Sequence, residues 1–168
     1  MPSWKFRASA LRFLPAALSC LAVVAVTTEA HSQAAVYAAK YVCGVAGSAA
    51  GSPGAGIVAT GAYFTSINVH NPNKQAVDIE KVFDIALPSE KQGGRIAGPV
   101  KASLKPQEAF EIECADIAHN LDFSPKSFTK GFVTLESSGP LDVVAVYTAA
   151  ASATGPVVAF HTERVPKE

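Results

Sequence analysis

This sequence contains little tryptophan, little methionine and no excess of either charge. Its 168 residues include one tryptophan and one methionine, and 14 acidic side chains balance its 14 basic ones. Binding to nucleic acid needs a basic face, so this balance argues against nucleic acid as a partner. Four tyrosines remain besides the lone Trp4, and they fall on core-like faces of predicted strands, which argues against an aromatic platform for carbohydrate.

Motifs that position a catalytic group are also missing. There is no GxSxG nucleophile elbow and no DxDxDG-type run for calcium. A cysteine–histidine nucleophile would need a free thiol, which an oxidising compartment disfavours. We therefore expect a protein that is not an enzyme and that needs no cofactor.

One long hydrophobic run exists, FLPAALSCLAVVAV at residues 13–26. It is shorter than the roughly 20 residues that span a bilayer, and three basic side chains precede it. Small residues then permit cleavage after Ala30 or after Ser32. The pattern predicts a secretory signal peptide over residues 1–32 and a single domain over residues 33–168. An uncleaved N-terminal anchor is the alternative.

Removal of this segment changes the charge of the chain. Residues 1–33 hold three basic side chains and one acidic one, so 11 basic and 13 acidic side chains remain, a net charge of −2. Such a chain is not attracted to anionic membrane surfaces. We predict a periplasmic or secreted protein with no stable membrane insertion after cleavage.

Two cysteines, Cys43 and Cys114, remain beyond the predicted cleavage site. In an oxidising compartment an even number of cysteines favours a disulfide. The bridge would close a loop of about 70 residues, to which the chain-entropy model assigns about 4 kcal/mol. The alternatives are a thiol pair that holds a metal ion and two buried free thiols.

Alternation of apolar and polar residues dominates the predicted domain. In the clearest strand, 76–87, Val77, Ile79 and Phe83 share one face and Lys81 interrupts it. This is the pattern of an antiparallel strand with one solvated face. Similar patterns predict strands at 36–45, 57–70, 100–104, 110–114, 131–136, 141–149 and 157–165.

The segments between these strands are turns and loops. Asn71, Pro72 and Asn73 form a predicted turn, since asparagine mimics backbone turns and proline fixes φ. Residues 88–99 are predicted to be a polar loop, and residues 115–130 are the only stretch that could hold a helical turn.

Seven or eight short strands separated by turn residues are typical of a β-sandwich or a small barrel. Because the strands are short and mostly one-sided, we predict an all-β fold, an antiparallel, immunoglobulin-like β-sandwich. The expected core includes Cys43 and Val45 on the inward face of the first strand. It also includes the aromatic side chains of Phe64, Phe83, Phe110, Phe132, Phe160, Tyr63 and Tyr147.

Three histidines, His70, His119 and His161, are candidate metal ligands because imidazole suits copper and zinc. None of them sits at a local ligand spacing such as HxH or HxxxH. A site would require the fold to bring distant elements together. The simpler interpretation is that each histidine is a surface residue at a strand end or rim and binds no metal.

Two pairs of carboxylates share a strand face, Asp78 with Glu80 and Glu111 with Glu113. Paired carboxylates are what glycoside hydrolysis uses. Charge on the solvated face of an antiparallel strand is expected in any case, so the pairs by themselves favour a structural interpretation.

Six short segments are the most characteristic of the chain, namely YVCG at 41–44, INVHNP at 67–72, LKPQEAFEIEC at 104–114, KGF at 130–132, LDVVAVYTA at 141–149 and ERVP at 163–166. Together they resemble a family of small, uncharacterised exported bacterial β-sandwich proteins. The order of elements is also distantly similar to that of sensory rhodopsin transducer-like β-sandwiches. Those proteins are soluble binding or signalling modules, so the resemblance implies a non-catalytic role. The family brings no assigned site residues.

The function expected from the sequence is an exported, non-catalytic β-sandwich that binds or assembles with another molecule in the cell envelope. Exposed sheet edges can support strand addition or a homo-oligomer. The partner would be a protein or a small molecule that the sequence does not identify. The alternatives are a periplasmic copper- or zinc-binding protein and, less favoured, a hydrolase with a carboxylate pair.

Overall fold

The computed structural model describes residues 34–48, 58–87, 93–124 and 126–168, all within the compact unit 31–168. The predicted signal peptide lies outside the described residues. The elements are β1 (Ala35–Ala46), β2 (Gly61–His70), β3 (Val77–Ile85), β4 (Ile96–Leu104), β5 (Ala109–Glu113), α1 (Cys114–Leu121), β6 (Thr129–Ser137), β7 (Asp142–Ala150) and β8 (Val157–Arg164).

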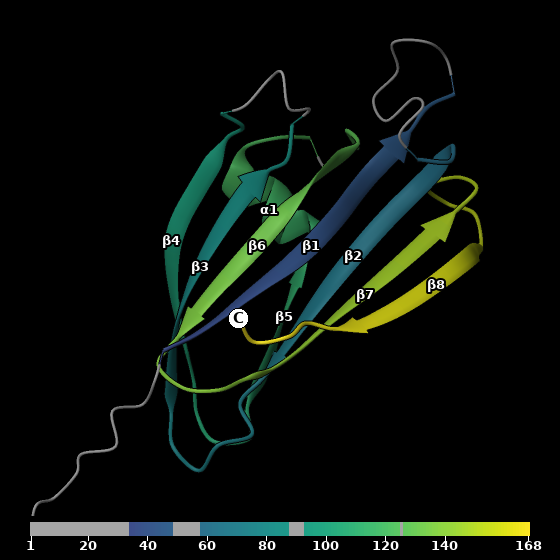
Figure 1. The fold of residues 1–168 in the computed structure, drawn as a ribbon. Helices are drawn as coiled ribbons and strands as arrows, with labels where there is room; N and C mark the ends of the chain where they lie inside the picture. Colours follow the sequence, from purple (N-terminus) through teal and green to yellow (C-terminus); the bar gives the residue numbers. More distant parts are fainter. Residues whose placement is uncertain (1–33, 49–57, 88–92, 125) are drawn as a thin grey trace, which may run out of the picture. The chain divides into compact units, whose positions relative to one another are not determined.

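The strands pair in the order β4-β3-β6-β1-β2-β7-β8, and every pair is antiparallel (Figure 1). We call β4-β3-β6-β1 the first sheet and β2-β7-β8 with β5 the second sheet. β1 joins the two, because it pairs with β6 along most of its length and with β2 only at Gly44, Val45 and Ala46. Beyond that contact β5 takes the place of β1 beside β2.

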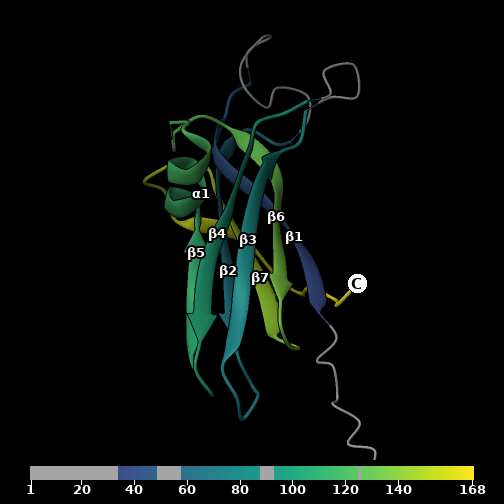
Figure 2. The ribbon, with the colours of Figure 1, turned by 90° about the vertical axis from the view of Figure 1, so that its left-hand side faces the viewer.

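Side chains from both sheets and from α1 form one core, and α1 and β5 lie to one side of β3, β6 and β1 (Figure 2). The predicted all-β antiparallel fold is confirmed, with eight strands and one short helix among the described residues. The largest fully buried apolar side chains are those of Tyr41, Ile67, Val69, Ile79, Phe83, Ile112, Ile117, Leu121, Val133, Leu135 and Val143.

A disulfide bond joins Cys43 of β1 to Cys114 at the start of α1, with the sulfur atoms 2.06 Å apart and the Cα atoms 5.6 Å apart. Both distances fall in the range of disulfide bonds. The predicted pairing is confirmed. The bond links the end of β1 to the start of α1. It lies where the neighbour of β2 changes from β1 to β5.

The inward face of β1 is predicted correctly up to Cys43 and wrongly at Val45, whose side chain is 40% exposed. The cause is Gly44, which has φ +92° and whose Cβ, if present, would collide with the backbone of Ser127. The positive φ interrupts the alternation of side chains, so Val45 turns outward and Ala46 is buried.

Gly131 in β6 has a different structural reason. It lies directly opposite Tyr41 of β1 and Ile85 of β3. The Tyr41 hydroxyl crosses this position and donates a hydrogen bond to the backbone oxygen of Asp84 (2.9 Å). A Cβ at residue 131 would overlap that oxygen and lie 2.8 Å from the Tyr41 hydroxyl. Burial, and secondarily the charge of Asp84, raise the pKa of Tyr41.

α1 follows β5 without a loop because Glu113 both ends the strand and caps the helix. The Glu113 side chain accepts a hydrogen bond from the Asp116 backbone, and the Asp116 carboxylate accepts one from the Glu113 backbone (2.9 Å). The helix buries Ile117 and Leu121. It confirms the prediction of a helical turn within residues 115–130.

Two further expectations need correction. β4 begins at Ile96, inside the predicted loop 88–99, because residues 96–97 continue the pairing with β3 beyond a register shift.

Of the five phenylalanines expected in the core, Phe83 is buried and Phe110 is partly buried, whereas three are exposed, namely Phe64, Phe132 and Phe160. Lys81, the exception in the β3 pattern, places its ammonium group 5.1 Å from the centre of the Phe110 ring.

No helix among the described residues is long and apolar enough to cross a membrane.

Candidate functional site

The second sheet turns one face to the core and the other to solvent. Antiparallel register places directly opposite residues on the same face, so Phe64 of β2, Thr148 of β7 and Phe160 of β8 form one row on the solvent side. Phe64 is 44% exposed and Phe160 is 68% exposed. We call this solvent side of the second sheet the outer face.

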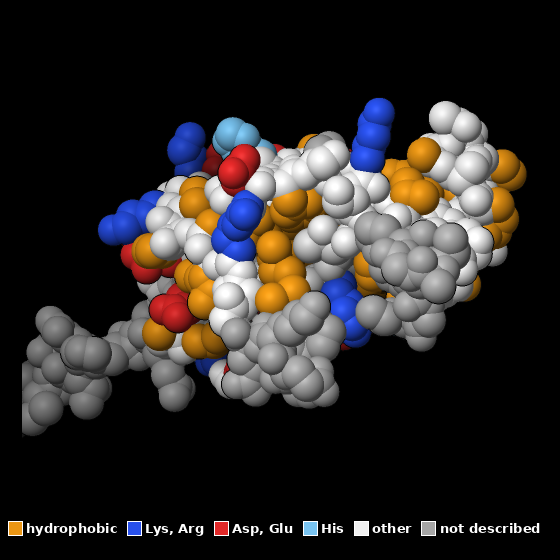
Figure 3. Space-filling model, turned by 90° about the horizontal axis from the view of Figure 1, so that it is seen from above, with side chains coloured by type: hydrophobic (Ala, Val, Ile, Leu, Met, Phe, Trp, Pro, Cys, Tyr) orange, Lys and Arg blue, Asp and Glu red, His pale blue; other side chains and the backbone are white. Residues whose placement is uncertain are grey.

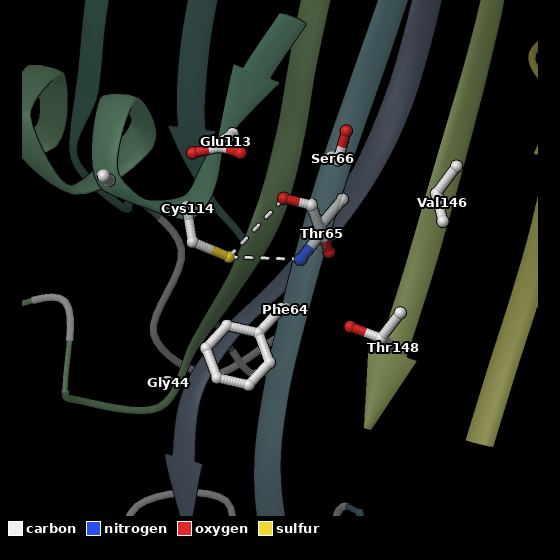
Figure 4. Close-up of a pocket in the computed structure, with 9 residues that line it drawn as sticks. Gly44, Phe64, Thr65, Ser66, Glu113, Cys114, Val146 and Thr148 are labelled. Carbon is white, nitrogen blue, oxygen red and sulfur yellow. Dashed lines mark hydrogen bonds between the residues drawn. The ribbon is translucent and has the colours of Figure 1, made fainter. Parts of the chain in front are cut away.

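A pocket of about 410 Å³ lies on the outer face beside the disulfide (Figure 4). The Phe64 ring, Val146 and Thr148 line it from the sheet, and Glu113 and Cys114 line it from the start of α1. It is open to solvent and mainly apolar. This pocket is concave enough to receive one side chain of a partner.

The floor of the pocket contains the seam between the two sheets. The buried Thr65 hydroxyl donates a hydrogen bond to the Val42 oxygen and accepts one from the Val42 nitrogen (both 2.9 Å). The Thr65 nitrogen donates to the sulfur of Cys114 (3.2 Å; dashed in Figure 4). Thr65 and the disulfide thus satisfy polar backbone groups of β1 and β2 where the two strands separate.

β8 is the free edge of the second sheet. It pairs with β7 and with no other described strand, and all eight of its residues are exposed. Three are large and apolar, Val157, Val158 and Phe160, with exposed fractions of 59%, 67% and 68%. Hydrophobic side chains are visible on the surface at the end of the molecule where β8 begins (right in Figure 3).

The backbone of β8 offers hydrogen-bonding groups along this edge. The Val165 nitrogen donates to the Val143 oxygen (2.9 Å), which identifies Val143 and Val165 as a hydrogen-bonded pair. Hydrogen-bonded and non-hydrogen-bonded pairs alternate in an antiparallel ladder. The N–H and C=O groups of Phe160, Thr162 and Arg164 therefore point away from β7.

Charged side chains of β8 are held by residues of β7. Arg164 forms an ion pair with Asp142 (3.0 Å). On the opposite side of the strand the His161 ring stacks on Tyr147, with centroids 5.9 Å apart and planes 20° apart. The pKa of Tyr147 is raised to about 12, first by burial and then by the charge of Glu163 and a hydrogen bond with that residue.

The opposite edge strand, β4, differs from β8 in its sequence. Pro99 has no N–H to donate, Gly98 has φ +115°, and the exposed Lys101 pairs with Glu80 (3.5 Å). Proline, lysine and irregular backbone are the usual means by which proteins prevent pairing at a sheet edge. β8 has neither proline nor lysine between Val157 and Arg164.

The three candidate metal ligands lie on separate elements. His70 ends β2 opposite Asp142, and His161 lies opposite Tyr147, five residues further along β7, which is roughly 17 Å. His119 is on the exposed side of α1. Within the part of the chain that the structure describes, no three histidine, cysteine, aspartate or glutamate side chains form a group that could hold a metal ion.

Three of the four candidate carboxylates already have partners in the fold. Glu80 pairs with Lys101, and Glu111 accepts a hydrogen bond from Ser66. Glu113 caps α1. The Asp78 backbone, meanwhile, accepts a hydrogen bond from the Ser138 nitrogen (2.9 Å). The two pairs lie on different sheets, Asp78 and Glu80 on β3 and the other two on β5.

Sequence reasoning identified sheet edges in general and missed β8 in particular. Residues 157–160 are apolar at four consecutive positions, which is not the alternation of a one-sided strand. Such a run indicates a strand covered on both faces. The run of four apolar residues was therefore the sequence signal that could have singled out β8.

No protein-family model matches the sequence, and no curated protein matches it. Among solved structures the chain is similar to one described as the crystal structure of Thermotoga maritima 1070. The two share 10% sequence identity with a TM-score of 0.49, and the match covers 83% of this chain and 97% of that one.

Proposed function

We propose that this chain is an exported, non-catalytic β-sandwich that acts in binding or assembly in the cell envelope, and that it engages its partner through the free edge of β8. The observation that carries the proposal is that all eight residues of β8 are exposed, on an edge strand with three large apolar side chains. Strand addition uses the free N–H and C=O groups of such an edge for affinity and neighbouring side-chain pockets for specificity.

Export is supported by two independent features. The N-terminal sequence has the order of a secretory signal peptide, with basic residues, a short apolar run and small residues. The disulfide between Cys43 and Cys114 is the kind of bond that persists in oxidising compartments.

Binding at β8 is supported by the contrast with β4. An exposed edge without proline or lysine tends to pair with other chains, and a protein tolerates it where the pairing is used. The pocket beside Phe64 lies on the same outer face, two strands away from β8. It can receive a side chain of a partner that extends across the face.

The proposal is tested by site-specific photocrosslinking of the full chain in its native host. A crosslinking residue at Thr162 of β8 should capture a second protein chain in the envelope fraction. The matched control is the same residue at Ser103, which is also exposed and lies on the other edge strand, β4. The proposal fails if the two positions give equal capture, or if the chain remains uncleaved in the cytosolic fraction.

A further inference from the structure

We propose that the partner of β8 is β8 of a second copy of this chain, paired antiparallel about a twofold axis that passes through Thr162. The inference rests on the proposed function, because it identifies the partner of the same edge. Two copies joined in this way form an isologous dimer with one continuous sheet across the interface.

The backbone limits the register of such a pair. Residues whose N–H and C=O groups point outward must meet each other, and in β8 these are Phe160, Thr162 and Arg164. A twofold axis within this segment can then pass through any residue from Phe160 to Arg164. With the axis at Thr162, Thr162 meets its own copy and Phe160 meets Arg164 of the partner subunit.

The side chains favour the axis at Thr162 because β8 is then complementary to itself in hydrogen bonding and in charge. His161 lies opposite Glu163 of the partner subunit, and this pair occurs twice. Phe160 lies opposite Arg164 of the partner subunit, also twice, which places a guanidinium group beside an aromatic ring. Opposite charges and cation–aromatic neighbours stabilise cross-strand pairs.

The other four registers lack this complementarity, and an axis at Glu163 or at Arg164 places that charged side chain opposite its own copy. An axis at Phe160 places Glu163 opposite Val157, and an axis at His161 places the two His161 rings opposite each other. An axis at Phe160 also uses residues 157–158, where the pairing of β8 with β7 shifts its register between Ala149 and Ala150. The axis at Thr162 uses only residues 160–164, which are regular.

Contacts within each copy already hold the charged side chains near the edge. Asp142 binds Arg164, and Tyr147 stacks on His161. Dimer formation therefore immobilises fewer freely rotating side chains than it would on an unsupported strand, which lowers the entropic cost of association.

The first test is sedimentation equilibrium of the chain purified from the envelope. The native chain should show a reversible monomer–dimer equilibrium. His161→Glu places like charges opposite each other twice and should raise the dissociation constant about tenfold. The double variant His161→Glu/Glu163→His restores the opposite charges and should return the constant to near its native value. His119→Glu, on the exposed side of α1, is the control and should have no effect.

The second test reads the register directly. Thr162→Cys should form an oxidised, covalently linked dimer faster than Phe160→Cys, because only residue 162 faces its own copy. Thr162→Pro removes one outward N–H without breaking a bond to β7 and should abolish the dimer, whereas Thr162→Ser should retain it. Circular dichroism verifies that each variant is folded.

The outcomes separate the inference from the proposed function. A monomer at all concentrations that still gives β8-specific crosslinks to another protein overturns the second-copy inference and leaves the proposed function standing. A dimer that persists in Thr162→Pro, or faster linkage of Phe160→Cys, also overturns the inference. A failure of β8-specific crosslinks of any kind overturns both.

Discussion

Asn71 has the largest number of polar contacts in the chain's described turns, and it is completely buried. Its side-chain nitrogen donates to the backbone oxygens of Gln75 (2.8 Å) and Leu104 (3.0 Å). Its side-chain oxygen accepts from the backbone of Asn73 (2.9 Å). The turn after His70 is thereby attached to the loop between β4 and β5, so the INVHNP segment has a structural reason to be distinctive.

Replacing Asn71 with alanine should lower the free energy of unfolding by about 2–3 kcal/mol, because it leaves buried carbonyl groups without a donor. Denaturant unfolding monitored by circular dichroism measures this. The matched control is Asn68→Ala, on the exposed outer face, where we expect a change within about 0.5 kcal/mol. Equal effects of the two substitutions would contradict the role assigned to Asn71.

Histidine 70 illustrates how far residue-level prediction reaches. The sequence correctly placed it at the end of a strand before an asparagine-proline turn. Whether it meets His119 or His161 depends on which strands become neighbours, and alternation does not contain that information. The structure puts β5 and β7 beside β2, so the neighbours of His70 are Ala109 and Asp142.

At the scale of single elements, β6 depends on one glycine. Gly131→Ala introduces a Cβ where the Asp84 backbone oxygen and the Tyr41 hydroxyl already lie. Since backbone atoms of β3 cannot yield cheaply, we expect a loss of at least about 3 kcal/mol in the free energy of unfolding.

Chemical denaturation of this variant provides the measurement, and Gly93→Ala serves as comparison because its added Cβ meets nothing within 4 Å. Gly93 has φ +99°, so this comparison carries a backbone cost of about 1 kcal/mol that Gly131→Ala does not share, and the loss at Gly131 should still be the larger one. A smaller loss at Gly131 than at Gly93 would show that β3 and β6 separate readily.

Element boundaries and inward faces were largely predictable because period-two alternation reports burial directly. On β2 the alternation puts Thr65, Ile67 and Val69 on one face, and the structure buries all three. Phe64, Phe132 and Phe160 were placed in the core on hydrophobicity alone, and that prediction is wrong. They are exposed because each lies on the side of its strand that faces away from the core. Which side that is depends on the pairing register and on which face of the sheet the core covers.

At the scale of the whole molecule, the disulfide is the covalent link between β1 and the helix beyond β5. Replacing both cysteines, Cys43→Ala/Cys114→Ala, releases a loop with a sequence separation of 71 residues. The chain-entropy model then predicts a loss of about 4 kcal/mol in the free energy of unfolding.

Guanidinium unfolding of the oxidised protein, the reduced protein and the double variant tests this value. The reduced protein and the double variant should agree with each other and unfold at lower denaturant concentration than the oxidised protein. If all three unfold together, the link contributes nothing and the hydrophobic core alone determines stability.

The pairing of β1 with β6 has a kinetic consequence. Its partners are as far apart in sequence as Ala35 and Ser137, and the Tyr37 hydroxyl binds the backbone of Leu141. β1 is also the strand that joins the two sheets. During synthesis β1 therefore cannot complete its pairing with β6 until the residues up to Ser137 have been made. Topologies dominated by such distant contacts fold slowly. For the export that we propose, slow folding would keep the newly made chain extended long enough to pass through a translocation channel.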